Sequence, residues 1–347
     1  MRYRVFGRHT GLRVSELALG TGNFGTAWGY GAPPDEAQRM LIRYFEAGGN
    51  LIDTADNYQF GQAETILGEL IGSRRDHLVL ATKYTWGQDE KGGLLVTGNS
   101  RLNMRRSVEA SLRRLRTDRI DLLWVHMPDS VTPIEEIVRG LDDLAREGKI
   151  VYAGLSDFPA WRVAHAAVLS ELRGTLPIAA IQIEYSLVER TSDRELLPMA
   201  AAHGLGVVAW SPLGGGLLTG KYRRGEQGRA TQLGTLIHAE DNAQKATVLD
   251  ALHEIAEQLG TSPGGVALAW VASKGIIPIL GPKSVAQLED NLAATQIRLT
   301  SEQLRRLETA SAVALGFPHE MLQQASTVER LNAGLKDSMV EVPAFVR

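Results

Sequence analysis

The stretch Leu19–Gly25, LGTGNFG, decides between two fold classes, because it contains the pattern G-x-G-x-x-G directly after an apolar run. In a dinucleotide-binding Rossmann domain this pattern follows a strand, opens a helix at its last glycine and precedes an acidic residue by about 20 positions. Here Gly25 is followed by TAWGYGAPPD, whose glycines and prolines delay any helix until Asp35. The acidic residue that ends the next strand, Asp53, comes too late. The context therefore favours a glycine-lined loop after a first strand.

Eight short apolar runs alternate with amphipathic stretches along the chain. The runs are Leu17–Leu19, Leu51–Asp53, Leu78–Ala81, Ile120–Val125, Ile150–Gly154, Ala180–Ile183, Gly206–Trp210 and Ile276–Leu280. Their nearly continuous apolar character is typical of parallel strands buried on both faces. Helical periodicity lies between them at Asp35–Ala47, Glu64–Ile71, Arg101–Leu115, Pro133–Arg146, Trp161–Leu172, Asp193–His203 and Thr247–Leu259. Eight such units without a Gly/Ser linker predict an α/β fold, a (β/α)8 TIM barrel.

Three segments lie outside this alternation. Tyr3–Leu19 reads as a β-hairpin that turns at Arg8–Gly11 and closes the bottom of the barrel. Leu213–Asp241 is long, basic and rich in glycine, which is typical of a functional loop. A polar tail with a helical pattern near Met321–Leu335 ends the chain. We expect one domain over residues 1–347, with a barrel core at about 15–310 and a C-terminal helical extension at about 311–347, which could cover the site.

Composition narrows the classes of partner. The formal net charge of -3 gives no electrostatic reason to bind nucleic acid or an anionic membrane. The absence of cysteine excludes disulfides, thiolate catalysis and cysteine-bound metal. Neither a signal-peptide pattern at the N-terminus nor a membrane-length apolar run is found, so we expect a cytoplasmic protein.

Ionisable residues stand at the ends of three consecutive predicted strands. These are Asp53, Lys83 and His126, and Tyr58 follows Asp53 by five positions. A buried lysine and a buried aspartate on neighbouring strands should form a pair, because either alone would be costly. The ammonium group would also lower the pKa of a nearby tyrosine, while desolvation would oppose this effect. The four residues therefore predict proton transfer by Tyr58 to a carbonyl that the imidazole orients.

Two other enzyme classes fit less well. A divalent-metal enzyme needs clustered His, Asp and Glu ligands, whereas His126 is a lone imidazole at its strand end, so we expect no metal. Phosphate-binding barrel isomerases also carry glycine-rich loops late in the barrel. They would not account for the set of Asp53, Tyr58, Lys83 and His126.

Seven motifs in order resemble those of the aldo-keto reductases. They are NLIDTADNYQFGQAETILGELIG (50–72), VLATK (79–83), RIDLLWVHMPDS (119–130), YAGLSDF (152–158), QIEYSL (182–187), WSPLGGGLLTGKY (210–222) and GPKSVAQLEDN (281–291), and the resemblance covers about residues 3–310. The chain looks like a bacterial-type member related to the potassium-channel β-subunit branch. The resemblance implies an NADP-dependent carbonyl reductase or alcohol dehydrogenase that reduces an aldehyde or ketone by hydride transfer. The alternative is a slow-turnover, cofactor-sensing regulatory protein like those β-subunits.

The resemblance assigns a role to each of the four polar residues. Tyr58 would be the general acid, Lys83 and Asp53 would tune it, and His126 would orient the carbonyl. The glycine-lined loop after the first strand would place Gly22 and Asn23 against the nicotinamide and its ribose.

The same resemblance implies an extended NADPH site across the carboxyl ends of the strands. Ser156, Asp157 and Gln182 would bind the carboxamide, although the family usually has Asn at position 157, and a carboxylate cannot donate to the amide oxygen. Trp210 would stack on the nicotinamide. The remaining implied contacts are Ser211, Pro212, Leu213, Gly215, Leu217, Lys221 and Arg229 toward the phosphates, and Gly281, Lys283, Ser284, Gln287, Asp290 and Asn291 toward the adenosine. Asp53 is also implied to bind the cofactor. Lys283, where relatives often have Arg, favours NADPH over NADH, although NADH stays possible.

Aromatic residues after several strands predict the substrate pocket. The candidates are Trp28, Tyr30, Tyr58, Trp86, His126, Met127 and Phe158, with Tyr185 as a further possibility. Such walls suit apolar or sugar-like carbonyl compounds. We expect a small-molecule carbonyl or alcohol as the partner, and either a monomer or a homo-oligomer.

Overall fold

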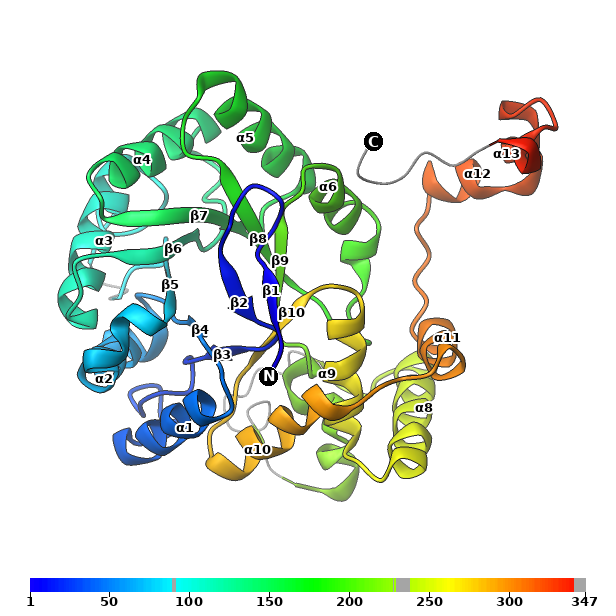
Figure 1. Cartoon of the computed structure of the whole chain (residues 1–347), viewed down its shortest axis with the longest axis horizontal. Coiled ribbons are helices and arrows are strands. Elements are labelled where there is room, and N and C mark those ends of the chain that lie inside the picture. The colour runs from blue at the N-terminus through cyan, green and yellow to red at the C-terminus, as the bar shows by residue number, and fades with distance from the viewer. Residues whose placement is uncertain (89–91, 227, 229–237, 340–347) are drawn as a thin grey trace.

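The computed structural model describes residues 1–88, 92–226, 228 and 238–339 of the chain. Within these residues, eight parallel strands close into a barrel that helices surround (Figure 1). The predicted (β/α)8 TIM barrel is thereby confirmed. Its strands are β3 (Ala18–Gly20), β4 (Leu51–Asp53), β5 (Val79–Tyr84), β6 (Ile120–Val125), β7 (Ile150–Ser156), β8 (Ile178–Glu184), β9 (Gly206–Trp210) and β10 (Ile277–Leu280).

The strands follow one another around the barrel in sequence order, and the last strand, β10, lies beside the first, β3. The closing pair, β10 and β3, is in register at Ile279↔Ala18 and Leu280↔Leu19. Because every neighbouring pair is parallel, all eight carboxyl ends lie at the same end of the barrel. That end is where residues from distant parts of the sequence meet.

Three strands, β5, β7 and β8, extend further toward this end than their apolar runs indicate. In the ladder Ser156 of β7 pairs with Gln182 of β8, and Glu184 of β8 pairs with Trp210 of β9. Polar residues at these positions do not continue the apolar pattern. Hydrophobicity alone therefore ends β5, β7 and β8 too early.

Helices pack around the outside of the barrel (Figure 1). They are α1 (Pro34–Glu46), α2 (Gln62–Ile71), α3 (Arg101–Leu115), α4 (Ile134–Arg146), α5 (Ala160–Arg173), α6 (Leu196–Ala202), α8 (Ala243–Leu259), α9 (Pro263–Ser273), α10 (Val285–Ala293) and α11 (Ser301–Ala310). Short 3-10 turns cover Tyr58–Gly61, Gly72–His77, Thr191–Asp193, Gly214–Thr219, Lys221–Arg224, Ala294–Gln296 and Lys336–Ser338.

Two helices differ from their sequence patterns. The stretch predicted as one helix over Asp193–His203 divides into a 3-10 turn and α6, which places Pro198 in the first turn of α6, where its missing N–H costs nothing. The helix α9 was not among the predicted helices. It is buried all along Gly264–Val271, so it has no polar face to mark an amphipathic period.

The N-terminal hairpin lies across the end of the barrel opposite the carboxyl ends. It pairs β1 (Tyr3–Val5) with β2 (Arg13–Ser15), and in Figure 1 it crosses the barrel opening. Ser15 N–H donates to the Asn50 side chain just before β4 begins, at 2.7 Å. Phe6, 1% exposed, belongs to the apolar cluster inside the barrel. The predicted closure of the barrel bottom by a hairpin agrees with this arrangement.

A tryptophan fills much of the barrel interior. Trp124 of β6 is 1% exposed and belongs to the same apolar cluster as Leu122 of its own strand, Ala180 of β8 and Val208 of β9. A Cβ atom on Gly154 of β7 would lie 2.3 Å from the Trp124 ring. The glycine therefore leaves the space that the indole occupies.

The C-terminal extension leaves the barrel after α11. It forms the short helices α12 (His319–Gln323) and α13 (Ala325–Leu331), where the sequence indicated one pattern, and both project away from the barrel in Figure 1. Just before α12, the Phe317 carbonyl accepts a hydrogen bond from the Arg194 side chain at 2.8 Å, which ties the start of the extension to the barrel. Within the described part of the chain, no helix has both the length and the apolarity needed to cross a membrane.

The helices α2 and α3 approach each other closely at Gly68. A Cβ atom added to Gly68 would lie 2.2 Å from the Arg114 carbonyl oxygen and 2.8 Å from the Leu115 Cα atom. Both contacts are with backbone, which cannot swing aside as a side chain can. The glycine thus sets the distance between the two helices.

We predict that Gly68→Ala destabilises the protein by about 1–3 kcal/mol, because the cost of overpacking exceeds the gain in helix propensity. Urea unfolding of both proteins measures the difference. Gly264→Ala is the matched control in another helix, since its Cβ would meet no atom closer than 3.4 Å. An equal loss of stability in both variants would contradict the close-packing argument.

Candidate active site

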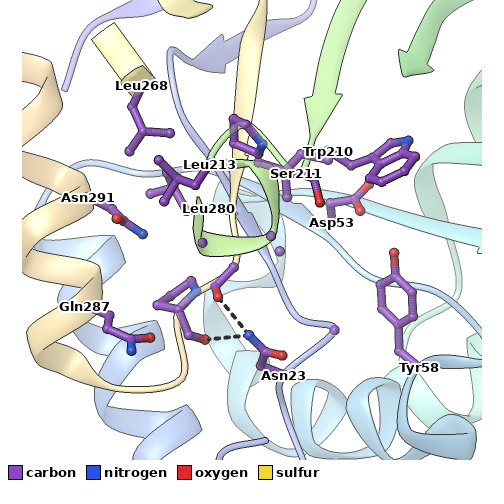
Figure 2. Close-up of a pocket in the computed structure, with 18 of the residues that line it drawn as sticks. Asn23, Asp53, Tyr58, Trp210, Ser211, Leu213, Leu268, Leu280, Gln287 and Asn291 are labelled. Atoms are coloured by element: carbon purple, nitrogen blue, oxygen red, sulfur yellow. Dashed lines mark hydrogen bonds between the residues drawn. The ribbon is translucent and has the colours of Figure 1, made fainter. Parts of the chain in front are cut away.

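A cavity of about 720 Å³ opens at the carboxyl ends of the strands. Figure 2 shows residues from both halves of the chain pointing into it, among them Asn23, Tyr58, Trp210 and Asn291. The predicted residues that line it are Gly22, Asn23, Trp28, Tyr30, Asp53, Tyr58, Trp86, His126, Met127, Ser156, Asp157, Gln182, Trp210, Ser211, Pro212, Leu213, Gly215, Lys221, Gly281, Gln287, Asp290 and Asn291. One cavity thus gathers residues from all the motifs quoted above except VLATK, whose Lys83 lies just beneath it.

The charged centre of the site is Lys83 of β5, which is 1% exposed. Its ammonium group forms an ion pair with Asp53 of β4, and it donates to the Thr54 carbonyl at 2.9 Å and to the Tyr58 hydroxyl at 3.0 Å. Burial alone would lower the pKa of Lys83, but Asp53 and then Tyr58 outweigh burial and raise it. Lys83 is therefore a cation held against the tyrosine hydroxyl.

Tyr58 sits in a tight turn that follows β4. The next two residues, Gln59 and Phe60, have left-handed backbones with φ of 52° and 53°. The Gln59 side chain is fully buried, accepts from Trp28 N–H at 2.8 Å and donates to the Tyr30 carbonyl at 2.9 Å. The turn that carries the tyrosine is thereby fixed to the loop after β3.

The stretch LGTGNFG forms this loop after β3. The Asn23 side-chain N–H groups donate to the Gly281 carbonyl at 2.7 Å and, more weakly, to the Pro282 carbonyl at 3.4 Å, as the dashed lines in Figure 2 show. Gln59 also donates to the Gly22 carbonyl at 3.2 Å. Gly22 and Asn23 line the cavity as predicted, but the amide of Asn23 is engaged with the loop that follows β10.

His126 follows β6 and lies beside the tyrosine, with a ring-centroid distance of 6.0 Å. Burial, and then the charge of Lys83, lower its pKa well below the usual value, so the imidazole is neutral. Its Nδ1 atom is buried and has no hydrogen-bond partner among the described residues. A proton on Nδ1 would be a buried donor without an acceptor, which favours the tautomer with the proton on Nε2.

The ends of β7, β8 and β9 form the adjoining wall. Gln182 donates to the second carboxylate oxygen of Asp53 at 2.8 Å, which ties this wall to the charged centre. Trp210 Nε1 donates to Asp157 Oδ1 at 3.0 Å. Asp157 has a left-handed backbone with φ of 56°, and burial raises its pKa to about 6. The carboxylate at position 157 therefore orients the indole.

A polar contact that the sequence reasoning missed lies behind Trp210. Glu184 ends β8, and its side chain bonds His238 Nε2 at 2.8 Å. The two residues are 54 positions apart: Glu184 lies in the motif QIEYSL and His238 in the segment Leu213–Asp241, but nothing in the sequence pairs them. Asn57, Arg224 and Glu226 also line the cavity without having been predicted. For the last two the signal was present, because they belong to the basic segment Leu213–Asp241.

The far end of the cavity contains both apolar and basic groups. Figure 2 shows Leu213, Leu268 and Leu280 on one side, close to Asn291. Lys221 also lines this region, and burial followed by repulsion from Lys283 lowers its pKa. Lys221 and Lys283 are thus close enough to repel each other, and an anion near both would relieve this repulsion.

Several predicted residues lie elsewhere. Leu217 is in the hydrophobic core and is 2% exposed. Lys283 and Ser284 do not line the cavity: the Lys283 ammonium group lies 4.9 Å from the centre of the Tyr30 ring, and Ser284 caps α10. Arg229 falls outside the described residues.

Two of the aromatic residues named for the substrate pocket, Phe158 and Tyr185, do not line the cavity. Phe158 is buried in the core, with the Arg162 guanidinium 5.1 Å from the centre of its ring. Tyr185 stacks on Trp270 at 5.5 Å in the core. No described residue of the C-terminal extension lines the cavity. The described residues also contain no group of three or more His, Cys, Asp or Glu that could hold a metal ion.

Comparison with known proteins identifies similar chains. A family described as "Aldo/keto reductase family" matches residues 16–312. The chain is 35% identical to norsolorinic acid reductase of Aspergillus flavus, over 96% of this chain and 88% of the relative. It is 35% identical to a Saccharomyces cerevisiae protein named "Putative aryl-alcohol dehydrogenase AAD14", over 92% of this chain and 89% of the relative. It is 39% identical to an uncharacterized oxidoreductase of Bacillus subtilis, over 88% and 95%.

We predict that Asp157→Asn stabilises the cofactor-free protein at pH 7.5 by about 1–3 kcal/mol. The raised pKa means that wild type loses stability as the pH rises from about 4 to about 6, while the neutral amide does not. The gain should therefore disappear near pH 4. Thermal or urea unfolding at the two pH values measures it.

Asp118→Asn is the control, because the Asp118 side chain is 90% exposed. It should change stability little at either pH. A pH-independent effect of Asp157→Asn would show that the Asp157 carboxylate does not titrate in this range.

Proposed function

The chain belongs to the aldo/keto reductase family, and on this premise we propose that it reduces an aldehyde or ketone to the alcohol with NADPH. The observation that carries the proposal is the position of Lys83, whose ammonium group holds both Asp53 and the Tyr58 hydroxyl at the edge of the cavity. When bound, the cofactor supplies the hydride that reduces the carbonyl carbon. The residues of this chain supply the proton and the orientation.

Tyr58 donates the proton to the carbonyl oxygen in this proposal. Its hydroxyl lies 3.0 Å from the Lys83 ammonium group, which stabilises the phenolate left behind. Asp53 keeps Lys83 charged inside the barrel, where an unpaired ammonium group would be too costly. In the reverse direction, the same phenolate accepts the proton of the alcohol.

His126 orients the carbonyl. With its proton on Nε2, the neutral imidazole donates a hydrogen bond to the substrate oxygen without competing with Tyr58 as an acid. Its low pKa is consistent with this role, since an imidazolium beside Lys83 would add a second buried cation. The two donors hold the oxygen from different sides.

The chemistry of the cavity fits NADPH. Ser156, Asp157 and Gln182 offer polar groups for the carboxamide, and Trp210 offers an aromatic face for the nicotinamide. At the far end, Lys221 and Lys283 repel each other, which an anionic phosphate would relieve. Gln287, Asp290 and Asn291 offer polar groups to the ribose and base. This basic end supports NADPH over NADH.

Aromatic carbonyl compounds are the substrate class that we propose. Trp28 meets Tyr58 edge-on at 6.1 Å, and Trp86 meets His126 edge-on at 6.5 Å, so two indoles flank the proposed reacting groups. Both line the cavity, and flat apolar rings pack well against such walls. The relative in yeast that is named as an aryl-alcohol dehydrogenase supports the same class.

We predict that Tyr58→Phe lowers kcat for an activated aromatic aldehyde, such as a nitrobenzaldehyde, by at least about 100-fold, because the general acid is lost. The affinity for NADPH should change by less than about threefold. Steady-state rates of NADPH oxidation and the quenching of tryptophan fluorescence measure the two effects. Tyr30→Phe, in the same cavity, is the matched control and should retain most of the activity.

A wild-type rate in Tyr58→Phe would exclude Tyr58 as the acid. The same assay separates the enzyme from a cofactor-sensing protein. Repeated turnovers for each protein molecule support the enzyme, whereas a single slow turnover of the bound cofactor supports the sensor.

We predict that Lys283→Ala weakens NADPH binding by about 10-fold or more and leaves NADH binding nearly unchanged, because only NADPH carries the 2′-phosphate. Fluorescence titration of the variant and of wild type with each cofactor measures the four dissociation constants. NADH serves as the internal control. Equal losses for both cofactors would remove the 2′-phosphate assignment of Lys283.

A further inference from the structure

Asp157 carries a negative charge that its surroundings do not neutralise. Its carboxylate accepts from Trp210 Nε1 at 3.0 Å and from the Ser156 hydroxyl at 3.4 Å, and both donors are neutral. No cation forms an ion pair with Asp157 among the described residues. The charge lies at the cavity wall, in the region proposed above for the nicotinamide.

The other charged groups that face this region are already engaged. Lys83 forms an ion pair with Asp53 and a hydrogen bond with Tyr58. Its effect on the pKa of Asp157 is smaller than the effect of burial. Glu184, from the neighbouring strand, adds repulsion, and its own partner is the titratable His238. His126 is neutral. Among the described residues around this region, Asp157 is therefore a carboxylate with no ion-pair partner, and a bound group would feel its charge directly.

The two redox states of a nicotinamide differ in charge. The oxidised ring is a cation and the reduced ring is neutral, so a nearby carboxylate attracts only the oxidised form. We propose that the Asp157 carboxylate makes this chain bind the oxidised cofactor in preference to the reduced one, and that taking up a proton on Asp157 removes the preference. The inference rests on the proposed function, because it requires the nicotinamide beside Trp210.

The direction of the pH dependence follows from burial. Because burial raises the pKa of Asp157 to about 6, the carboxylate is charged at pH 7.5 and largely protonated at pH 5. The preference for the oxidised form should therefore be present at the higher pH and fade at the lower one. At neutral pH the protein would bind NADP⁺, which carbonyl reduction produces, more tightly than NADPH, which the reaction consumes.

The test measures the dissociation constants of NADP⁺ and NADPH for the full chain at pH 5.5 and pH 7.5, by fluorescence titration without substrate. The quantity of interest is the ratio of the NADPH constant to the NADP⁺ constant. Titration of the 2′-phosphate near pH 6 cancels in this ratio, since both forms carry it. In wild type the ratio should rise about 3- to 10-fold between the two pH values.

Asp157→Asn is the decisive variant. Asparagine has the same shape, tolerates the left-handed backbone and still accepts from Trp210 Nε1, but it carries no charge. Its ratio should stay the same at both pH values and match that of wild type at low pH. A ratio that still rises with pH in Asp157→Asn, or that never rises in wild type, would overturn the inference.

His238→Gln separates Asp157 from the other titratable group nearby. If the pH dependence survives in His238→Gln and is lost in Asp157→Asn, it belongs to Asp157. The reverse pattern would assign it to the Glu184–His238 pair and overturn the inference. If wild type binds neither NADP⁺ nor NADPH, the proposed function fails, and the inference fails with it. Binding of both forms with a constant ratio defeats the inference alone.

Discussion

A buried ammonium group is the constraint on which the rest of the site depends. Lys83 is almost completely excluded from water, and such a cation is stable only with a carboxylate and hydrogen-bond acceptors around it. Asp53 supplies the carboxylate, and Thr54 and Tyr58 supply the acceptors, all from the segment that follows β4. The need to stabilise one charge therefore fixes the end of β4, the turn that carries the tyrosine and, through Gln182, the wall formed by the ends of β7, β8 and β9.

The same exclusion of water shifts the pKa values of the neighbouring ionisable groups. It keeps His126 neutral, because a second cation would be uncompensated beside Lys83. It also raises the pKa of Asp157, which has hydrogen-bond donors but no counter-charge among the described residues. Lys83, His126 and Asp157 thus respond differently to the same exclusion of water. The division follows from which of them has a charged partner, and it gives each residue a different chemical use.

Sequence patterns predicted the barrel and its charged centre because both depend on local spacing. Apolar runs marked every strand, and polar residues at the ends of consecutive strands had to meet at one end of a parallel barrel. Directions of side chains were beyond the same reasoning. Phe158 and Leu217 turn into the core, since the backbone conformation at each place decides which way they point. The helix α9 has no polar face, so it leaves no amphipathic pattern to detect. The Glu184–His238 contact joins segments 54 positions apart, and no local spacing links the two residues.

The closure of the ring also bears on the order in which the molecule forms. β3 finds its second neighbour only in β10, and Asn23 bonds to Gly281, which lies 258 residues further along the chain. During synthesis one edge of β3 stays unpaired until β10, the last strand of the barrel, has left the ribosome. The cavity, whose floor spans that seam, is consequently among the last parts to exist. In a nascent chain the Lys83–Asp53 pair can form early. The cavity proposed for the dinucleotide is complete only after the last strand has joined the barrel.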